Sequence, residues 1–254
     1  MGAGHAHPLY LPGHSPVHRL PAEVKIVAAL LGAICVVATP RAAFGVFAGH
    51  LAVLATVWAI ARIPPGWILR RTVIELPFVV LAVLLPVTGP DPRIDVLGVA
   101  LSEPGVLGAW NIVVKGTLGV LISLTLAATT PLRDLLLGMQ RLRAPALVVT
   151  ITTLMLRYTD LIVAEAGRMR RARLARGHDP RFLWQVGATA RGIGALFVRA
   201  YERGERVHLA MLSRGFDGAL PQAAEGAPSR RQWVTGLAPA GVAILLAAAG
   251  WSVG

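Results

Sequence analysis

The sequence predicts an all-α, polytopic helical membrane protein of about five transmembrane helices with a further helix-rich region on the cytoplasmic face. The chain of 254 residues is 55% hydrophobic and 15% charged. Its mean hydropathy of +0.62 is too high for an ordinary soluble domain. Several runs approach the roughly 20 apolar residues that a helix needs to cross a bilayer. Between the fourth and last of these runs lies a long basic region.

Five apolar runs are the predicted transmembrane helices: residues 24–37, 42–60, 72–87, 109–129 and 234–251. Proline and glycine clusters break the chain after the first two runs. A polar loop over residues 91–108 separates the third run from the fourth. The single cysteine lies inside the first run and cannot form an internal disulfide.

Residues 1–22 form a predicted irregular N-terminal segment that contains four of the seven histidines. His5, His7, His14 and His18 suit a flexible tail better than a metal site, because their spacings match no compact set of ligands. The segment does not resemble a cleavable signal peptide, which would have a charged end followed by an apolar core.

Two residues are candidates for ionisable groups inside the membrane. Glu75 is near the start of the third span and Lys115 near the start of the fourth. Ionisable groups inside a membrane suggest function by default. Since both lie close to span ends, extension of the side chain to the interface is the simpler explanation.

The distribution of charge predicts the topology. The net charge of +12 comes almost entirely from arginine, and residues 131–231 hold 17 of the 25 basic residues. Four spans from a cytoplasmic N-terminus return the chain to the cytoplasm at Pro131, with Arg62, Arg70 and Arg71 in the inner loop. This arrangement follows the positive-inside rule.

The run over residues 146–164 is long enough to span but contains Arg157 and Asp160. If it crossed, the arginine-dense stretch that follows would lie outside. We therefore expect a helix buried against protein or lying in the interface. The predicted segments are an N-terminal segment (1–22), spans one to four (23–130), a cytoplasmic-face region (131–218), a linker (219–232) and the last span (233–254).

One short phrase occurs twice in the cytoplasmic-face region. Residues 174–179 and residues 212–217 both read Leu-x-Arg-Gly-x-Asp, each after a helix-like segment. Glycine readily takes the left-handed conformation that closes a helix. The repeat therefore predicts two helices that end at Gly177 and Gly215, with Arg176 and Arg214 projecting from their tips.

Two interpretations of the repeat remain open. An Arg-Gly pair can be an ordinary helix end, since cations are favoured at helix C-termini. Helix capping requires neither the shared leucine nor the shared aspartate, however. In the second interpretation each projecting guanidinium forms a bidentate pair with a carboxylate of a partner protein.

Other classes of function have weaker support. The sequence holds no Walker-type phosphate loop and no cysteine–histidine cluster with metal spacing. It shows no local serine–histidine–aspartate arrangement and no aromatic interleaving that would suit nucleic acid. One alternative is a membrane-embedded metal-dependent enzyme that uses the histidines with Asp91, Asp95 and Glu103. Another is an arginine-rich region that only binds anionic lipid.

The sequence resembles the transmembrane T component of energy-coupling-factor (ECF) importers, in particular the cobalt-type CbiQ branch. The resemblance covers most of the chain and is strongest over residues 129–218. It is carried by residues 16–20, 23–25, 128–131, 157–158, 168–173, 175–177 and 202–215.

The resemblance implies a non-catalytic scaffold in the inner (cytoplasmic) membrane. Its coupling helices would dock on two cytoplasmic ABC ATPase subunits and join them to a substrate-binding membrane subunit. The first docking signature matches the family in full, and the second has serine in place of alanine. The implied docking residues are Ala175, Arg176, Gly177, Ser213, Arg214 and Gly215. No cofactor or metal ligand is expected, and cobalt, nickel or a vitamin remain open as the substrate.

Overall fold

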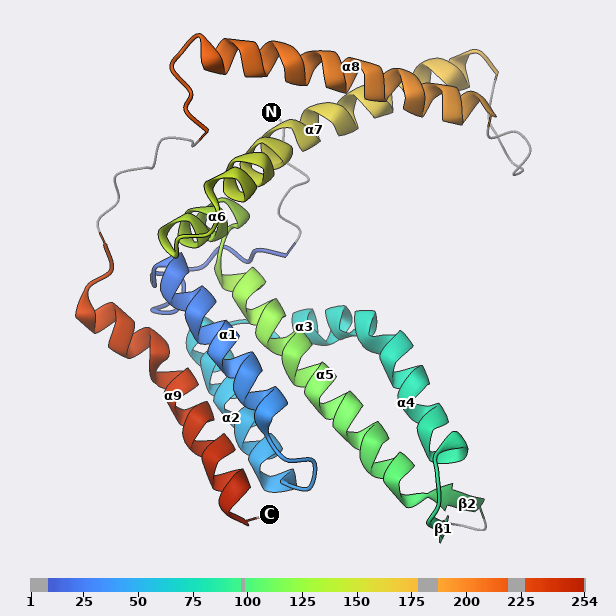
Figure 1. Ribbon diagram of the computed structural model, residues 1–254, viewed down its shortest axis with the longest axis vertical. Coiled ribbons are helices and arrows are strands. Elements are labelled where there is room, and N and C mark those ends of the chain that lie inside the picture. The colour runs from blue at the N-terminus through green and yellow to red at the C-terminus, as the bar shows by residue number, and fades with distance from the viewer. Residues whose placement is uncertain (1–8, 97–98, 178–186, 219–226, 254) are drawn as a thin grey trace. The chain divides into compact units, whose positions relative to one another are not determined.

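The computed structural model describes residues 9–96, 99–177, 187–218 and 227–253 (Figure 1). These residues are helical apart from one short β-hairpin and the connecting loops. The chain forms two compact units. The bundle unit comprises residues 9–138 with 225–254, and the arm unit comprises residues 139–224 with the first eight.

Four long helices form the bundle unit: α1 (Ala22–Ala38), α2 (Phe44–Ala61), α5 (Glu103–Thr129) and α9 (Arg230–Val253). Helix α1 packs against α5 and α9, and α2 packs against the same two helices (Figure 1). The four helices therefore form a closed ring in which α1 and α2 face each other across the centre. Small side chains allow the close packing of α1 on α9, where Cys35, Ala243 and Ala247 form a buried cluster.

Four helices of the described residues are long and apolar enough to cross a membrane: α2, α5, α9 and α7 (Ala146–Ala175). Helix α1 has 17 residues, somewhat fewer than the roughly 20 needed. The fold is thus the predicted polytopic, helical membrane type. Helix α7 joins the predicted 146–164 helix to the arginine-rich stretch as one continuous helix. Its length and composition are compatible with crossing, and its interfacial position stays a prediction.

The third predicted span is not one continuous helix over residues 72–87. The chain forms α3 (Pro65–Thr72), a 3₁₀ turn η1 (Val73–Glu75) and then α4 (Leu76–Thr88). Pro77 lacks an amide hydrogen, so the helical ladder cannot run unbroken through this point and a new helix starts here.

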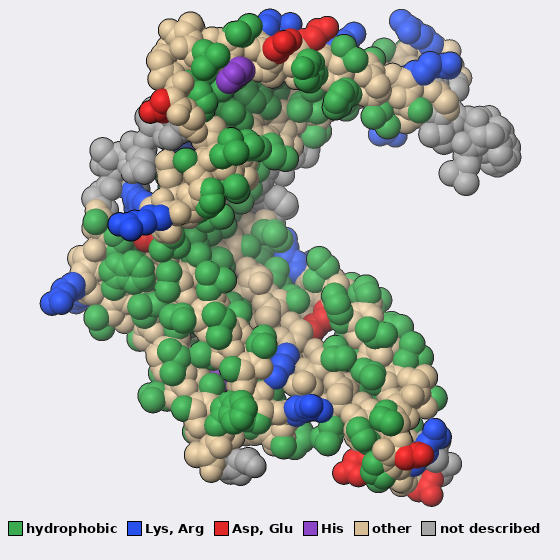
Figure 2. All heavy atoms as spheres, in the orientation of Figure 1, with side chains coloured by type: hydrophobic (Ala, Val, Ile, Leu, Met, Phe, Trp, Pro, Cys, Tyr) green, Lys and Arg blue, Asp and Glu red, His purple; other side chains and the backbone are tan. Residues whose placement is uncertain are grey.

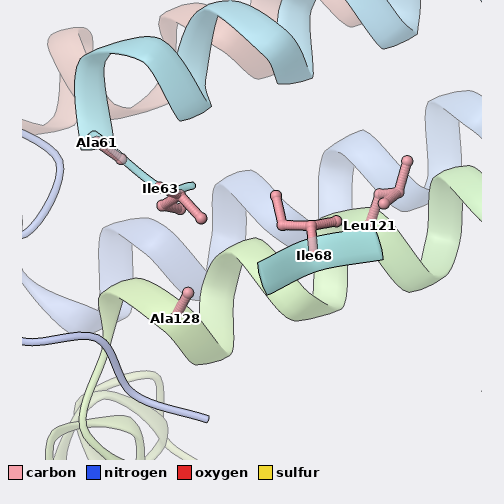
Figure 3. Packing of buried hydrophobic residues seen from close by; sticks show 5 residues of the cluster. All are labelled: Ala61, Ile63, Ile68, Leu121 and Ala128. Atoms are coloured by element: carbon pink, nitrogen blue, oxygen red, sulfur yellow. The ribbon is translucent and has the colours of Figure 1, made fainter. Parts of the chain in front are cut away.

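A buried cluster fixes α3 on the bundle. Ile68 of α3 packs with Ile63 and Ala61 from the end of α2, and with Leu121 and Ala128 of α5 (Figure 3). Helix α4 packs mainly along α5 and leaves its other faces exposed. Figure 2 shows hydrophobic side chains spread over the visible face of the bundle unit, as expected for a surface that meets lipid.

The predicted irregular loop over residues 91–108 is largely ordered structure instead. Strands β1 (Arg93–Val96) and β2 (Val99–Ser102) pair antiparallel. Helix α5 then begins at Glu103, six residues before the predicted start of the span. Ser102 caps this helix by accepting a hydrogen bond from the backbone N–H of Gly105 at 3.1 Å. The sequence analysis missed this cap and therefore set the helix start too late.

The chain's two lysines bond the ends of neighbouring antiparallel helices. Lys25, at the start of α1, donates to the carbonyl of Thr129 at the end of α5 over 2.9 Å. Lys115 of α5 donates to the carbonyl of Val37 at the end of α1 over 2.7 Å. Each ammonium thus satisfies a carbonyl at a helix C-terminus, where the helix dipole favours a cation. Lys115 is well inside α5 and serves this packing.

Glu75 does not extend to the interface as expected. The residue is 3% exposed, and its carboxylate accepts a hydrogen bond from the Thr117 hydroxyl at 3.0 Å. A β-carbon at Gly116 would lie only 2.7 Å from that carboxylate, so glycine makes room for it. The buried carboxylate ties the break between α3 and α4 to the middle of α5.

The N-terminal segment is held together by His18 and attached to the bundle through Leu11. The imidazole contacts the Leu11 carbonyl through Nε2 at 3.1 Å and the Ser15 hydroxyl through Nδ1 at 2.7 Å. The Leu11 amide donates to the Ala128 carbonyl at 3.0 Å. The expected flexible tail is therefore wrong for His18, whereas His5 and His7 lie outside the described residues.

Candidate functional site

The first predicted tip is the C-terminus of α7. Arg176 is the C-cap residue with φ −88° and ψ 12°, and Gly177 follows with φ +76°. The Gly177 amide donates to the Leu174 carbonyl at 2.9 Å. Gly177 therefore takes the left-handed conformation predicted from the sequence. His178 and Asp179 lie outside the described residues.

The second tip is the C-terminus of α8 (Gly187–Leu212). Gly215 has φ +81°, its amide donates to the Leu212 carbonyl at 3.0 Å, and the Phe216 amide donates to the Met211 carbonyl at 3.0 Å. These two bonds define a Schellman motif with Gly215 at the C′ position. Arg214 therefore holds the same position relative to its glycine as Arg176 does.

Two other helices of the described chain end in the same hydrogen-bond pattern with arginine in place of glycine. Arg62 follows α2 with φ +56°, and Arg143 follows α6 (Leu132–Arg141) with φ +62°. In those ends the arginine itself is left-handed, at a cost of about 1–2 kcal/mol relative to glycine. At the two tips a glycine takes the left-handed position instead, so the preceding arginine keeps an unstrained backbone.

All six predicted docking residues are exposed in the structure: Ala175, Arg176, Gly177, Ser213, Arg214 and Gly215. Added β-carbons at Gly177 and Gly215 would meet no atom within 4 Å, so the space around both turns is open. The tips are therefore accessible to a large partner, within the part of the chain that the structure describes.

A shared carboxylate joins helices α7 and α8 of the arm unit. Glu165 of α7 accepts a hydrogen bond from Arg199 of α8 at 3.1 Å and from Arg203 at 3.2 Å. The Glu165 side chain is 12% exposed, whereas that of Arg199 is 58% exposed. A β-carbon at Gly192 would lie 3.9 Å from the Met169 methyl group. From the Glu165 contact to the Met169 contact the chain runs forward along α7 and backward along α8, so the two helices are antiparallel.

Both tips lie several turns beyond this ion-pair cluster. Arg176 is 11 residues beyond Glu165 along α7, and Arg214 is 11 residues beyond Arg203 and 15 beyond Arg199 along α8. At 1.5 Å per residue the first tip is about 16 Å and the second about 16–22 Å along its helix from the cluster. Because the helices are antiparallel, the two tips point away from it in opposite senses.

Helix α8 also carries a row of exposed apolar side chains at helical spacing. Ile193, Phe197 and Tyr201 are 64%, 69% and 65% exposed. Exposed apolar rows of this kind mark surfaces that meet another protein or a membrane. The arm unit therefore presents an uncovered face as well as two charged tips.

The alternative metal site does not assemble among the described residues, which hold no group of three or more candidate ligands. Asp91 is paired with Arg93 at 3.1 Å, and its side chain is 85% exposed. Asp95 and Glu103 are likewise exposed. The acidic loop thus shows none of the convergence that a metal centre needs.

The residues that hold α7 and α8 together were not predicted from the sequence. Glu165 is the only acidic residue between Leu161 and Arg176, and such an isolated acidic residue in an arginine-rich helix was the available signal. The fold and site together define a polytopic helical membrane protein whose arm unit carries two equivalent arginine tips.

Residues 13–224 match the CbiQ family, described as cobalt transport proteins. The chain is 34% identical over 173 residues to the cobalt transport protein CbiQ of Rhodobacter capsulatus, covering 67% of this chain and 68% of that protein. It is 24% identical over 261 residues to the energy-coupling factor transporter transmembrane protein EcfT of Acidaminococcus fermentans, covering 96% of both. A putative fused cobalt transport protein, CbiMQ of Methanocorpusculum labreanum, is 27% identical, and the match covers 36% of its length.

The chain therefore belongs to the CbiQ family and is a transmembrane component of an ECF transporter. This confirms the family expected from the sequence. The relatives are transporter components, in keeping with a non-catalytic transport subunit.

Proposed function

We propose that the chain is the scaffold that couples two cytoplasmic ABC ATPase subunits to a separate substrate-binding membrane subunit. The observation that carries this proposal is the pair of equivalent, exposed arginine tips on one ion-paired arm unit. Two like partners need two like docking points, and the tips share the same backbone geometry.

Arginine suits such a docking point for a physical reason. Its planar guanidinium donates two parallel hydrogen bonds to a carboxylate, which gives geometric specificity as well as charge. The left-handed glycine after each arginine stops the helix, so the side chain stands at the tip. Small residues before each arginine, Ala175 and Ser213, let a groove on the partner close around it.

The arm unit would transmit motion because its two helices are joined by Glu165. When ATP binding and hydrolysis move the two ATPase subunits relative to each other, the tips are displaced in opposite senses. The ion pairs convert this displacement into a change in the crossing of α7 and α8. The substrate-binding subunit would contact the apolar row on α8 and would move when the crossing of α7 and α8 changes.

The substrate we propose is cobalt or another transition metal, bound by the partner subunit. This rests on the relatives named for cobalt transport. Relatives named EcfT carry no substrate in their names, and a vitamin importer is the second candidate. We place the chain in the inner (cytoplasmic) membrane with a cytoplasmic N-terminus, because that orientation puts the arginine-rich arm on the ATPase side.

The test replaces Arg176 and Arg214 by glutamate, singly and together, and measures co-purification of the ATPase subunits. Each single change should weaken assembly, and the double variant should lose most of the bound ATPase and of the metal uptake. Arg206→Glu is the matched control, since Arg206 is also an exposed arginine of α8 but not at the tip. Undiminished assembly in the double variant would rule out the docking role.

A further inference from the structure

The bundle unit encloses a cavity of about 300 Å³ at the centre of its four-helix ring. All four ring helices and the N-terminal segment line it. Small side chains on α1 and α9, among them Ala28, Gly32 and Ala240, leave the space open. Ligand pockets in proteins begin at roughly this volume.

The cavity extends along most of α1. Its lining residues on α1 run from Lys25 to Val36, a distance of about 16 Å along a helix. The Val36 end is closed, because Val36 is 2% and the neighbouring His50 3% exposed. At the other end Lys25 itself is 8% exposed, and the cavity reaches the surface beside the exposed lining residues Pro16, Ile60 and Thr235.

The threonine hydroxyls on the wall are already hydrogen-bonded within the protein. Thr125 donates to the Leu121 carbonyl at 2.7 Å and accepts from the Trp58 indole at 2.7 Å. Thr129 and Thr235 each donate to a carbonyl one turn earlier in their own helices. A cavity lined by apolar groups stays dry and takes up hydrocarbon, as a cavity of roughly 150 Å³ does with benzene. The chemistry of the wall therefore suits a hydrocarbon chain.

The open end carries positive charge. The Lys25 ammonium has three donors. It gives two of them to the neutral carbonyls of Thr129 and His18, at 2.9 and 3.4 Å. Arg19 just before α1, and Arg230 and Arg231 at the start of α9, are exposed at the same end. Asp134 lies close enough to Lys25 to interact with its charge. A phosphate at this end would meet the third ammonium donor and three exposed arginines, which outnumber that one carboxylate.

We propose that the cavity is a binding site for one acyl chain of an anionic phospholipid, whose phosphate lies at Lys25. The chain fills the space between the four helices and the headgroup closes the open end. This site lies wholly in the bundle unit and is independent of the docking role of the tips. The bound lipid would act as a structural part of the ring, filling the space between α1, α2, α5 and α9.

The test uses the full chain in detergent with phosphatidylglycerol that carries a photoactivatable diazirine on one acyl chain. Mass spectrometry locates the covalent adducts. We expect adducts on cavity-lining residues such as Val53, Val57 and Leu126, which unlabelled phosphatidylglycerol should suppress in the wild type. Labelling that does not saturate, or that falls only on outward residues such as Leu30 and Ile34, would overturn the proposal.

Gly32→Leu should fill the cavity and reduce these adducts at least fivefold. A β-carbon there would lie 3.7 Å from Ile122, an ordinary contact distance, so the new side chain has room to enter. Gly241→Leu is the control, because Gly241 is an exposed helical glycine with no neighbour within 4 Å. Unchanged adducts in Gly32→Leu would contradict the site.

The headgroup is tested separately with phosphatidylcholine that carries the same labelled chain. We expect it to label the cavity several-fold less than phosphatidylglycerol, and Lys25→Gln to remove that preference while Lys25→Arg keeps it. Equal labelling of the wild type by the two lipids would overturn the assignment of an anionic headgroup.

Discussion

At the scale of single residues, the two tips depend on glycines with left-handed backbones. An L-residue in that conformation costs about 1–2 kcal/mol, whatever the space around it. Gly215 has φ +81° and open surroundings, so only the backbone penalises a substitution. Gly204 also has open surroundings but lies inside α8, where alanine is the better residue.

The same substitution should therefore have opposite effects at these two positions. Gly215→Ala should speed hydrogen exchange of the last-turn amides of α8 by roughly fivefold, the equivalent of about 1 kcal/mol. Gly204→Ala should slow exchange within α8 instead, since it removes a flexible residue from the helix interior. Slower exchange at the tip in Gly215→Ala would show that the left-handed turn is absent.

His18 makes the folded N-terminal segment sensitive to pH. Burial lowers the pKa of its imidazole, and the positive charge of Lys25 and the nearby His14 act in the same direction, against the bond to the Leu11 carbonyl. The unfolded state binds the proton more readily, so stability is full above the ordinary value of about 6.5 and is lost as the pH falls below it.

We expect the thermal midpoint of the full chain to drop between pH 7 and pH 5. His18→Gln should flatten that part of the pH dependence relative to the wild type, because glutamine does not titrate and keeps a donor for the Leu11 carbonyl. Scanning calorimetry or fluorescence in detergent measures the midpoint. An identical pH dependence in the two proteins would exclude His18 as the source.

Residue-level prediction succeeded where the chemistry is local. The repeated Arg-Gly phrase was enough to predict two left-handed glycines, because helix capping depends on a few consecutive residues. The repeat could not reveal that Glu165 forms ion pairs with Arg199 and Arg203. Nor does the sequence show that each lysine donates a hydrogen bond to a carbonyl of another helix. Those contacts join residues 34 or more positions apart and depend on the packing of whole helices.

At the scale of elements, α7 and α8 act as a pair because of one carboxylate. Ion pairs at exposed sites contribute little to stability, typically below about 1 kcal/mol. The value of this cluster lies in geometry, since one mostly buried acceptor fixes the crossing point of two long helices. A change there should alter the spacing of the tips more than the stability of the fold.

Glu165→Gln should broaden the distribution of distances between the tips. Spin labels at Ala175→Cys and Ser213→Cys, in a chain whose single native cysteine is replaced, report that distance by pulsed electron resonance. Glu202→Gln is the control, because Glu202 makes an exposed pair with Arg206 at 4.0 Å within α8 alone. A distance distribution in Glu165→Gln as narrow as in the wild type would show that Glu165 does not fix the spacing of the tips.

Element boundaries were predicted well where apolar runs end at proline or glycine, as for α1, α2 and the end of α5. They failed around residues 72–108. Pro77 divides the third span, and the Ser102 cap starts α5 inside the expected loop. Hydropathy alone is insensitive to both features, since it averages over the residues that decide where a helix begins.

At the scale of the whole molecule, the chain separates a membrane-type bundle from an arm. The bundle is a ring of four helices with an apolar exterior, and the arm carries the arginine-rich helices and exposed apolar side chains. Composition predicted an arginine-rich region between the apolar runs, because charge and hydropathy are distributed unevenly along the chain. The central cavity could not be predicted, since it depends on how the small residues of α1 and α9 are placed relative to α2 and α5.

The central claim is that the two tips contact ATPase subunits directly. Its most direct test places a photo-crosslinking amino acid at Ala175 or Ser213, beside each tip arginine, in the assembled transporter. His208, an exposed residue within α8, is the control position. We predict ATPase adducts from both tip positions and few from position 208. Adducts with lipid alone, or ATPase adducts only from position 208, would contradict the claim.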